Sequence, residues 1–177
     1  MQTEKLTGKK YIINLKTIHF AMVFGLLSFF VIALFLKEPI SREELILSEI
    51  KPSLINVYFL ILGIFSFFGL IVGEILSRKK IEQARTKILL IEKVNEYMAA
   101  KIIKYAMLEA PTLLAIVFYL MAPLLGFVVL TIALLALLLI SYPSKSRIIQ
   151  ELNLKKQEMQ IFNSPEKLIS DNELNNL

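Results

Sequence analysis

Long apolar runs separated by polar segments dominate this sequence. The longest run covers residues 105–142, and Glu109 is the only charged side chain among its 38 residues. One helical crossing of the roughly 30 Å hydrocarbon layer of a membrane takes about 20 residues. The run is therefore long enough for two spanning helices, and the helix breakers Pro123 and Gly126 predict a turn near its middle.

Two further apolar runs precede this one. Residues 17–36 end without the small-residue cleavage site of a signal peptide, so we expect a retained spanning helix there. The next run extends over residues 54–76. Together with third and fourth spans at residues 103–122 and 124–142, these runs predict an all-α fold. The expected architecture is a polytopic membrane bundle of four transmembrane helices, arranged as two helical hairpins.

The segment between the second and third runs is the most charged part of the chain. No glycine or proline interrupts residues 74–110, so we expect both helices to extend beyond the membrane. The resulting cytosolic helical extension would cover residues 77–102, with a turn near residues 86–91. In the first polar loop, Ser41 and Glu44 have the spacing of a capping box and predict a short surface helix.

The chain leaves its last apolar run at Pro143, and Ser144 is well placed to cap a following helix. The apolar spacing over residues 148–154 predicts an amphipathic helix that lies on the membrane or on the central polar segment. Ser164 marks a second helix start. Residues 143–177 are therefore predicted to form a cytoplasmic amphipathic helical tail.

Composition agrees with a membrane protein and excludes several kinds of site. Hydrophobic residues make up 56% of the chain, and the mean hydropathy is +0.64, which is unlike a soluble domain. The absence of cysteine excludes disulfides and thiolate metal sites. The sequence contains no phosphate-binding loop, nucleophile elbow or zinc motif. No enzyme activity, cofactor, metal site or nucleic-acid partner is therefore predicted.

Lysine and arginine are distributed unevenly between the two sides of the predicted bundle. The two terminal segments and the central loop together hold seventeen of them, whereas the remaining loops hold three. The positive-inside rule then predicts that the N and C termini are cytoplasmic, and the membrane is expected to be a bacterial inner membrane. The basic central loop either serves only as this topology signal or also binds anionic lipid or a cytosolic partner.

Glu109 is the sharpest candidate for a functional residue. It lies five residues beyond Lys104, which is about 7 Å deeper along a helix. An ionisable group inside a spanning helix is costly and is by default a functional candidate. Tyr105 and Thr112 fall on the same helical face, so this face could carry a proton or a cation. The alternative is a buried carboxyl that only donates a structural hydrogen bond to a neighbouring helix.

Two other ionisable residues are predicted at a depth comparable to that of Glu109. Glu74 lies one turn before Arg78, so it can form an ion pair at the membrane interface. His19, the only histidine, lies three residues inside Lys16. A proton or divalent-metal site that combines His19, Glu74 and Glu109 is one hypothesis, and separate interfacial pairing of Glu74 is the other.

Small residues recur at helical spacing on the first two predicted spans. Gly69, Gly73 and Ser77 lie four residues apart, which is the pattern of close helix packing in membranes. Gly25 ends a similar series on the first span. These faces pack either within the bundle or at an interface with a homo-oligomeric or membrane-complex partner.

Two segments resemble an uncharacterised family of four-helix inner-membrane proteins of Bacteroidota. They are the segment at residues 105–120, which contains Glu109-Ala-Pro-Thr, and the segment at residues 142–154, which begins Tyr-Pro-Ser-Lys. This resemblance implies four membrane helices and no established activity. Residues 57–121 more loosely resemble the hairpin of rotary ATPase proteolipids, the c-ring subunits. That resemblance implies a proton-carrying role for Glu109, although this chain has fewer glycines and a longer polar loop.

Two function hypotheses follow from these observations. The first is a noncatalytic integral membrane protein that serves as a small subunit or scaffold of an inner-membrane assembly. The second is a proton- or cation-translocating membrane protein that uses the intramembrane carboxylate Glu109. In either case the lipid bilayer is an expected partner, together with a second copy of the chain or another membrane subunit.

Overall fold

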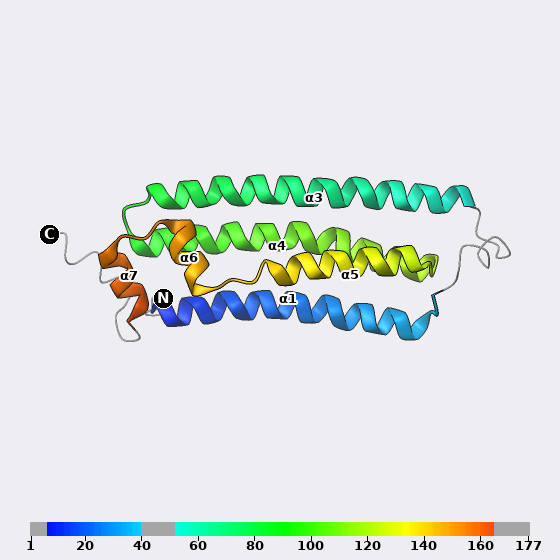
Figure 1. Ribbon diagram of the computed structural model, residues 1–177, viewed down its shortest axis with the longest axis horizontal. Coiled ribbons are helices and arrows are strands. Elements are labelled where there is room, and N and C mark those ends of the chain that lie inside the picture. The colour runs from blue at the N-terminus through cyan, green and yellow to red at the C-terminus, as the bar shows by residue number, and fades with distance from the viewer. Residues whose placement is uncertain (1–6, 40–51, 165–177) are drawn as a thin grey trace, which may run out of the picture. The chain divides into compact units, whose positions relative to one another are not determined.

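The computed structural model describes residues 7–39 and 52–164, and these residues form six α-helices and no strand (Figure 1). The helices are α1 (Gly8–Leu36), α3 (Pro52–Thr86), α4 (Leu90–Met121), α5 (Leu125–Ile140), α6 (Lys145–Leu152) and α7 (Lys156–Asn163). The prediction of an all-helical chain is confirmed for the described residues. The short helix predicted from Ser41 and Glu44 lies outside them.

Three of the helices are long and apolar enough to cross a membrane, namely those at Gly8–Leu36, Ser53–Thr86 and Leu90–Met121. A fourth crossing is obtained if α5 and α6, which are bent by 73° at a short break, count as one span. With 16 residues, α5 alone is about 24 Å long. The described helices therefore fit an integral membrane protein with three to four spans.

Two short connections join the long helices where the sequence predicted them. Residues 87–89 form the turn between α3 and α4, within a stretch that lacks glycine and proline. Residues 122–124 separate α4 from α5, and Pro123 lies at the centre of this break. Gly126 lies directly after this break, in the first turn of α5, so the turn is found near both predicted helix breakers.

The chain divides into two compact units. The apolar unit contains Ala21–Glu74 and Tyr105–Ser141, and the polar unit contains Met1–Phe20, Ile75–Lys104 and Tyr142–Leu177. The polar unit holds seventeen of the twenty lysines and arginines but only nine of the fifteen acidic residues. Its net charge is therefore +8, and it contains most of the charged residues of the sequence.

Stacked aromatic rings join α3 to α4 and α5 in the apolar unit. Tyr58 of α3 stacks on Phe118 of α4, with ring centroids 4.7 Å apart. One residue further along α3, Phe59 stacks on Phe127 of α5 at 4.4 Å. A methyl group at Gly126 would lie 2.8 Å from the Phe59 ring, so a glycine there leaves room for this stack.

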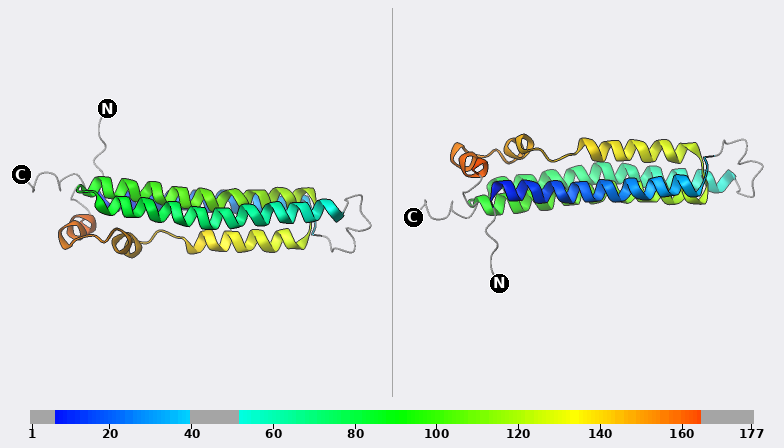
Figure 2. Two further views of the ribbon diagram at one scale, coloured as in Figure 1. Left: turned by 90° about the horizontal axis from the view of Figure 1, so that it is seen from above. Right: turned by 90° about the horizontal axis from the view of Figure 1, so that it is seen from below.

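The two short helices α6 and α7 belong to the polar unit, together with the first part of α1 and the joined ends of α3 and α4 (Figure 2). Each of them buries apolar side chains, namely Ile148, Leu152, Ile161 and Phe162. The Phe162 ring meets the ring of Tyr11 on α1 edge to face, with centroids 6.2 Å apart. The Ser144 hydroxyl accepts a hydrogen bond from the Arg147 amide and caps α6, as predicted.

The tail contains a helix that was not predicted from the sequence. Asn153 adopts a left-handed conformation with φ 50°, which ends α6 and redirects the chain. The next helix, α7, begins at Lys156, a start that the sequence analysis missed. Ser164, the predicted start, directly follows the last residue of α7, and the residues of any helix beyond it lie outside the described part.

Candidate functional site

Glu109 lies on α4 at the edge of the face that packs in the apolar unit. The side chains of Leu108 and Thr112 are buried, whereas Glu109 is of intermediate exposure. Within the described residues, the Glu109 carboxyl forms no hydrogen bond or ion pair. The expected hydrogen bond from a buried, inward-facing acid to a neighbouring helix is therefore not found there.

The hydroxyl groups predicted to share the face of Glu109 bond to backbone carbonyls. The Tyr105 hydroxyl donates to the Ser141 carbonyl at 3.2 Å. The Thr112 hydroxyl donates to the Leu108 carbonyl, one turn earlier on the same helix, at 2.7 Å. Both side chains are fully buried. The Tyr105 hydroxyl therefore bonds to the end of α5, and the Thr112 hydroxyl bonds within α4. These two hydrogen bonds do not form a chain that leads to Glu109.

His19 and Glu74 have different surroundings. His19 is only 3% exposed, and its ring meets the Tyr142 ring edge to face at 5.6 Å, within the polar unit. Glu74 is partly exposed and has an interaction partner, as does Arg78. Across residues 7–39 and 52–164, no three or more His, Asp or Glu side chains are grouped so that they could hold a metal ion. The hypothesis of a metal site formed by His19, Glu74 and Glu109 thus gains no support.

The small residues of α3 line its buried face. Gly69, Gly73 and Ser77 are all buried, and Ser66 continues the same stripe. A methyl group at Gly69 would overlap the carbonyl oxygen of Met107 on α4 and would lie 3.4 Å from the Pro111 ring. The glycine therefore lets the two helices approach with their backbones in contact.

Gly25 on α1 has the opposite surroundings. It is exposed, and a methyl group there would meet no atom of the described residues within 4 Å. Thr17 and Ala21, which precede it at the same helical spacing, are also exposed. The small-residue pattern on α1 therefore lies on a face that does not pack within the described chain.

Two ion pairs with buried lysines were missed by the sequence analysis, and both lie in the polar unit. Lys93 of α4 and Glu158 of α7 are 2.6 Å apart, with side chains only 8% and 6% exposed. The Lys101 ammonium lies 2.7 Å from the Glu151 carboxylate of α6 and 5.1 Å from the centre of the Tyr97 ring. These pairs join the tail helices to α4.

A sequence signal for these pairs does exist. The two lysines lie eight residues apart on α4, which is about two helical turns, whereas the two glutamates lie seven residues apart on two different helices, α6 and α7. Lys93 also lies next to the buried Val94, on the side of α4 that packs in the polar unit. The spacing of the lysines indicates that they recur along one side of α4, but it does not indicate which carboxylates they meet.

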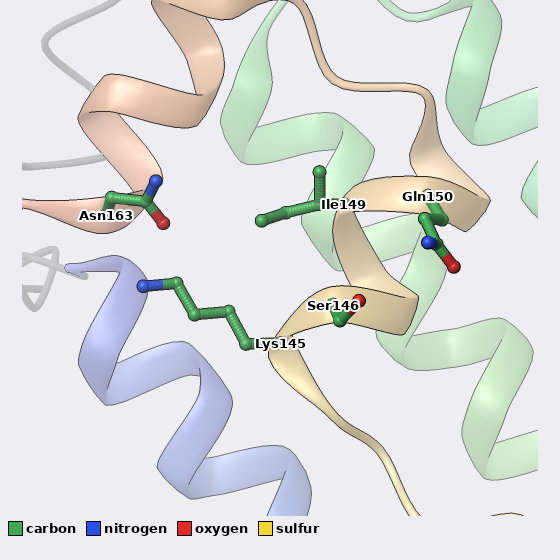
Figure 3. Close-up of a pocket in the computed structure, with 5 residues that line it drawn as sticks. All are labelled: Lys145, Ser146, Ile149, Gln150 and Asn163. Atoms are coloured by element: carbon green, nitrogen blue, oxygen red, sulfur yellow. The ribbon is translucent and has the colours of Figure 1, made fainter.

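An open pocket of about 510 Å³ lies on the surface of the tail helices (Figure 3). Its lining consists of Lys145, Ser146, Ile149 and Gln150 from α6 and Asn163 from α7. In Figure 3 the Lys145 side chain extends towards Asn163, and Ile149 projects between the two helices. These five side chains include no carboxylate or imidazole, so they provide no acid–base pair for catalysis.

No protein family, curated protein or solved structure matches this chain.

Proposed function

We propose that this chain is a noncatalytic integral membrane protein that acts as a small subunit or scaffold of a membrane assembly, with the bacterial inner membrane as its site. The observation that carries the proposal is the exposed small-residue face around Gly25 on α1. Small residues allow the backbone of another helix to approach closely, and this close packing is a main source of helix association in a bilayer. The equivalent face of α3 is already used inside the chain, around Gly69.

A second feature supports a structural role. Ion pairs with buried lysines join α6 and α7 to α4, so the polar unit contains a folded, basic module instead of a loose tail. A folded module of this kind presents a fixed surface to a second protein. In the proposed orientation this module is cytoplasmic, because it carries most of the lysines and arginines.

The proposal is tested by purification from a mild detergent, followed by native mass spectrometry. Gly25→Leu is expected to remove a second copy or a co-purifying membrane subunit, because the larger side chain blocks close approach. Gly63→Leu is the matched control, since Gly63 on α3 is equally exposed and also has no atom near its added methyl group. Identical assemblies for the parent and both variants, or equal losses for the two variants, would contradict the proposal.

Proton or cation translocation through Glu109 is a second candidate. It is favoured by one observation: the carboxyl is half-buried in a helix that is apolar enough to span a membrane. The measurement is proton uptake into vesicles that contain the purified protein, driven by a potassium diffusion potential. Uptake above that of empty vesicles, and its loss in Glu109→Gln but not in Glu74→Gln, would favour translocation over the scaffold role.

A further inference from the structure

Glu109 is an acid of the apolar unit whose charge has no partner in the described chain. The described residues of this unit include three acids, namely Glu38, Glu74 and Glu109. Glu38 is exposed beyond the end of α1, and Glu74 has an interaction partner. Among residues 7–39 and 52–164, the Glu109 carboxyl has neither a hydrogen bond nor an ion pair. A charge inside a spanning helix is costly, so it calls for a compensating group from elsewhere.

The described cation of the apolar unit lies far from Glu109. It is Lys37, and its carbonyl accepts a hydrogen bond from Tyr119. Tyr119 follows Glu109 by ten residues, which is about 15 Å along α4. The other two cations of the unit, Arg42 and Lys51, belong to the segment between α1 and α3 and lie outside the described residues. The described part of this unit therefore supplies no cation near Glu109.

Small side chains surround Glu109 on the outer side of α4. Ala106 and Ala110 are both exposed, and Leu113, one turn further, is 37% exposed. The predicted span would turn this face towards lipid. Alanine is much shorter than glutamate, so these neighbours leave the carboxyl accessible from the bilayer.

The position of Glu109 along α4 brings its carboxyl towards the headgroup layer. Glu109 lies five residues, or about 7 Å, beyond Lys104, the last cation before the apolar run. Side chains of an α-helix lean towards its N-terminus, which for α4 is the cytoplasmic side in the predicted orientation. Charged side chains near the end of a span reach the headgroups in this way, and the bilayer thins locally around them. A lipid headgroup is therefore within reach of this carboxyl.

We propose that Glu109 binds the primary ammonium group of a phosphatidylethanolamine headgroup. A carboxylate accepts charge-assisted hydrogen bonds, and a primary ammonium group carries three N–H donors. The choline headgroup has methyl groups in their place and cannot donate such a bond. This site gives Glu109 a use that requires no transport, and it does not depend on the proposed subunit role.

The test measures lipid binding to the full-length, delipidated protein in a neutral detergent, by native mass spectrometry. The probes are phosphatidylethanolamine, its N-methyl and N,N-dimethyl derivatives, and phosphatidylcholine, all with the same acyl chains. We expect binding to weaken with each methyl group, by about tenfold over the whole series. Millimolar ethanolamine is expected to displace little of the lipid, because the acyl chains contribute to binding. Equal binding of phosphatidylcholine, or complete displacement by ethanolamine, would overturn the proposal.

Three variants locate the preference at the Glu109 carboxylate. Glu109→Gln keeps the size of the side chain but removes its charge, and it should reduce the preference for phosphatidylethanolamine to less than about twofold. Glu109→Asp keeps the carboxylate and should retain most of the preference. Glu74→Gln is the matched control, because it removes an acid of the same unit that already has a partner, and it should leave the preference unchanged. A full preference in Glu109→Gln, or an equal loss in Glu109→Asp or Glu74→Gln, would overturn the proposal.

A last variant separates this site from the proposed subunit interface. Gly25→Leu is expected to disrupt the assembly but to leave the preference for phosphatidylethanolamine at its parent value. A loss of preference in Gly25→Leu as large as that in Glu109→Gln would assign the lipid to the assembly interface and would overturn the site at Glu109. Retention of the assembly in Gly25→Leu, together with an unchanged lipid preference, would contradict the subunit proposal alone.

Discussion

Gly69 of α3 lies directly against the carbonyl oxygen of Met107 in α4. Met107 is the residue four positions before Pro111, so its carbonyl lacks the amide donor that a helix normally supplies there. A Cα–H group can form a weak hydrogen bond to such an oxygen, and a glycine approaches closely enough to do so. The glycine on one helix and the proline on the other thus form a single packing feature of the apolar unit.

This contact predicts a clear difference between two glycine substitutions. Gly69→Ala should lower the melting temperature in detergent, because its methyl group overlaps the Met107 carbonyl and forces the helices apart, at a cost of about 1–3 kcal/mol. Gly63→Ala is the control on the same helix, where the added methyl meets open space. The control is expected to melt at or above the parent temperature, since alanine favours a helix over glycine. A Gly69→Ala protein as stable as the control would contradict the close packing.

The ion pair between Lys93 and Glu158 connects α7 to α4 at a distance of 2.6 Å. The Glu158 carboxylate also accepts a hydrogen bond from the Lys155 amide at 2.7 Å, so it caps its own helix as well. Both side chains are almost completely buried. Removal of one partner would leave the other charge buried and uncompensated, which typically costs about 3–5 kcal/mol.

We therefore predict that Glu158→Gln releases α7. Hydrogen exchange of the amides at residues 156–163 should become much faster than in the parent. Glu92→Gln is the matched control, because its ion pair with Lys87 spans 4.0 Å and both side chains are about half exposed. Such a surface pair contributes at most about 1 kcal/mol, so exchange in α7 should stay unchanged. Protection of α7 that is equal in both variants would show that apolar contacts alone hold the tail.

The predictable parts of this fold depend on local properties of the sequence. The length of the apolar runs and the position of Pro123 suffice to locate the long helices and the break at residues 122–124. The start of α7 at Lys156 has no comparable local signal. It depends on the left-handed Asn153 and on Glu158, whose carboxylate pairs with a lysine 65 residues earlier in the chain.

The candidate sites illustrate the same limit. Depth along a helix can be read from the sequence, so Glu109 and His19 could be located relative to the apolar runs. Rotation about the helix axis relative to neighbours cannot be read in this way. Gly69 and Gly25 both belong to series of small residues spaced four apart. Gly69 nevertheless lies against a backbone carbonyl, whereas a methyl group at Gly25 would have no atom of the described residues within 4 Å. A spacing pattern indicates which faces can pack closely, but long-range contacts decide which of them do.

The charge distribution predicts the orientation of the chain in the membrane. The natural sequence contains no cysteine, so single cysteines at Ser48 and Ser164 can be labelled without background. In intact cells, an impermeant thiol reagent should label Ser48→Cys, whereas Ser164→Cys should react only after the membrane is opened. Leu113→Cys, on the exposed face of α4, should react poorly in both cases, because the predicted span would turn this face towards lipid. Labelling of Ser48→Cys and Ser164→Cys from the same side would contradict the three crossings predicted between them.

The last prediction compares two neighbouring residues of α4 that receive the same new side chain. Glu109 is half-buried and its carboxyl forms no hydrogen bond within the described residues, so Glu109→Gln should change stability by less than about 1 kcal/mol. Leu108 is 3% exposed, and Leu108→Gln should be destabilising by about 2 kcal/mol or more, because it buries an amide among apolar groups. Melting in detergent and co-purification of the assembly measure both variants. A scaffold should keep its assembly in Glu109→Gln, so a loss of assembly as large as in Leu108→Gln would assign Glu109 a structural role that its contacts do not indicate.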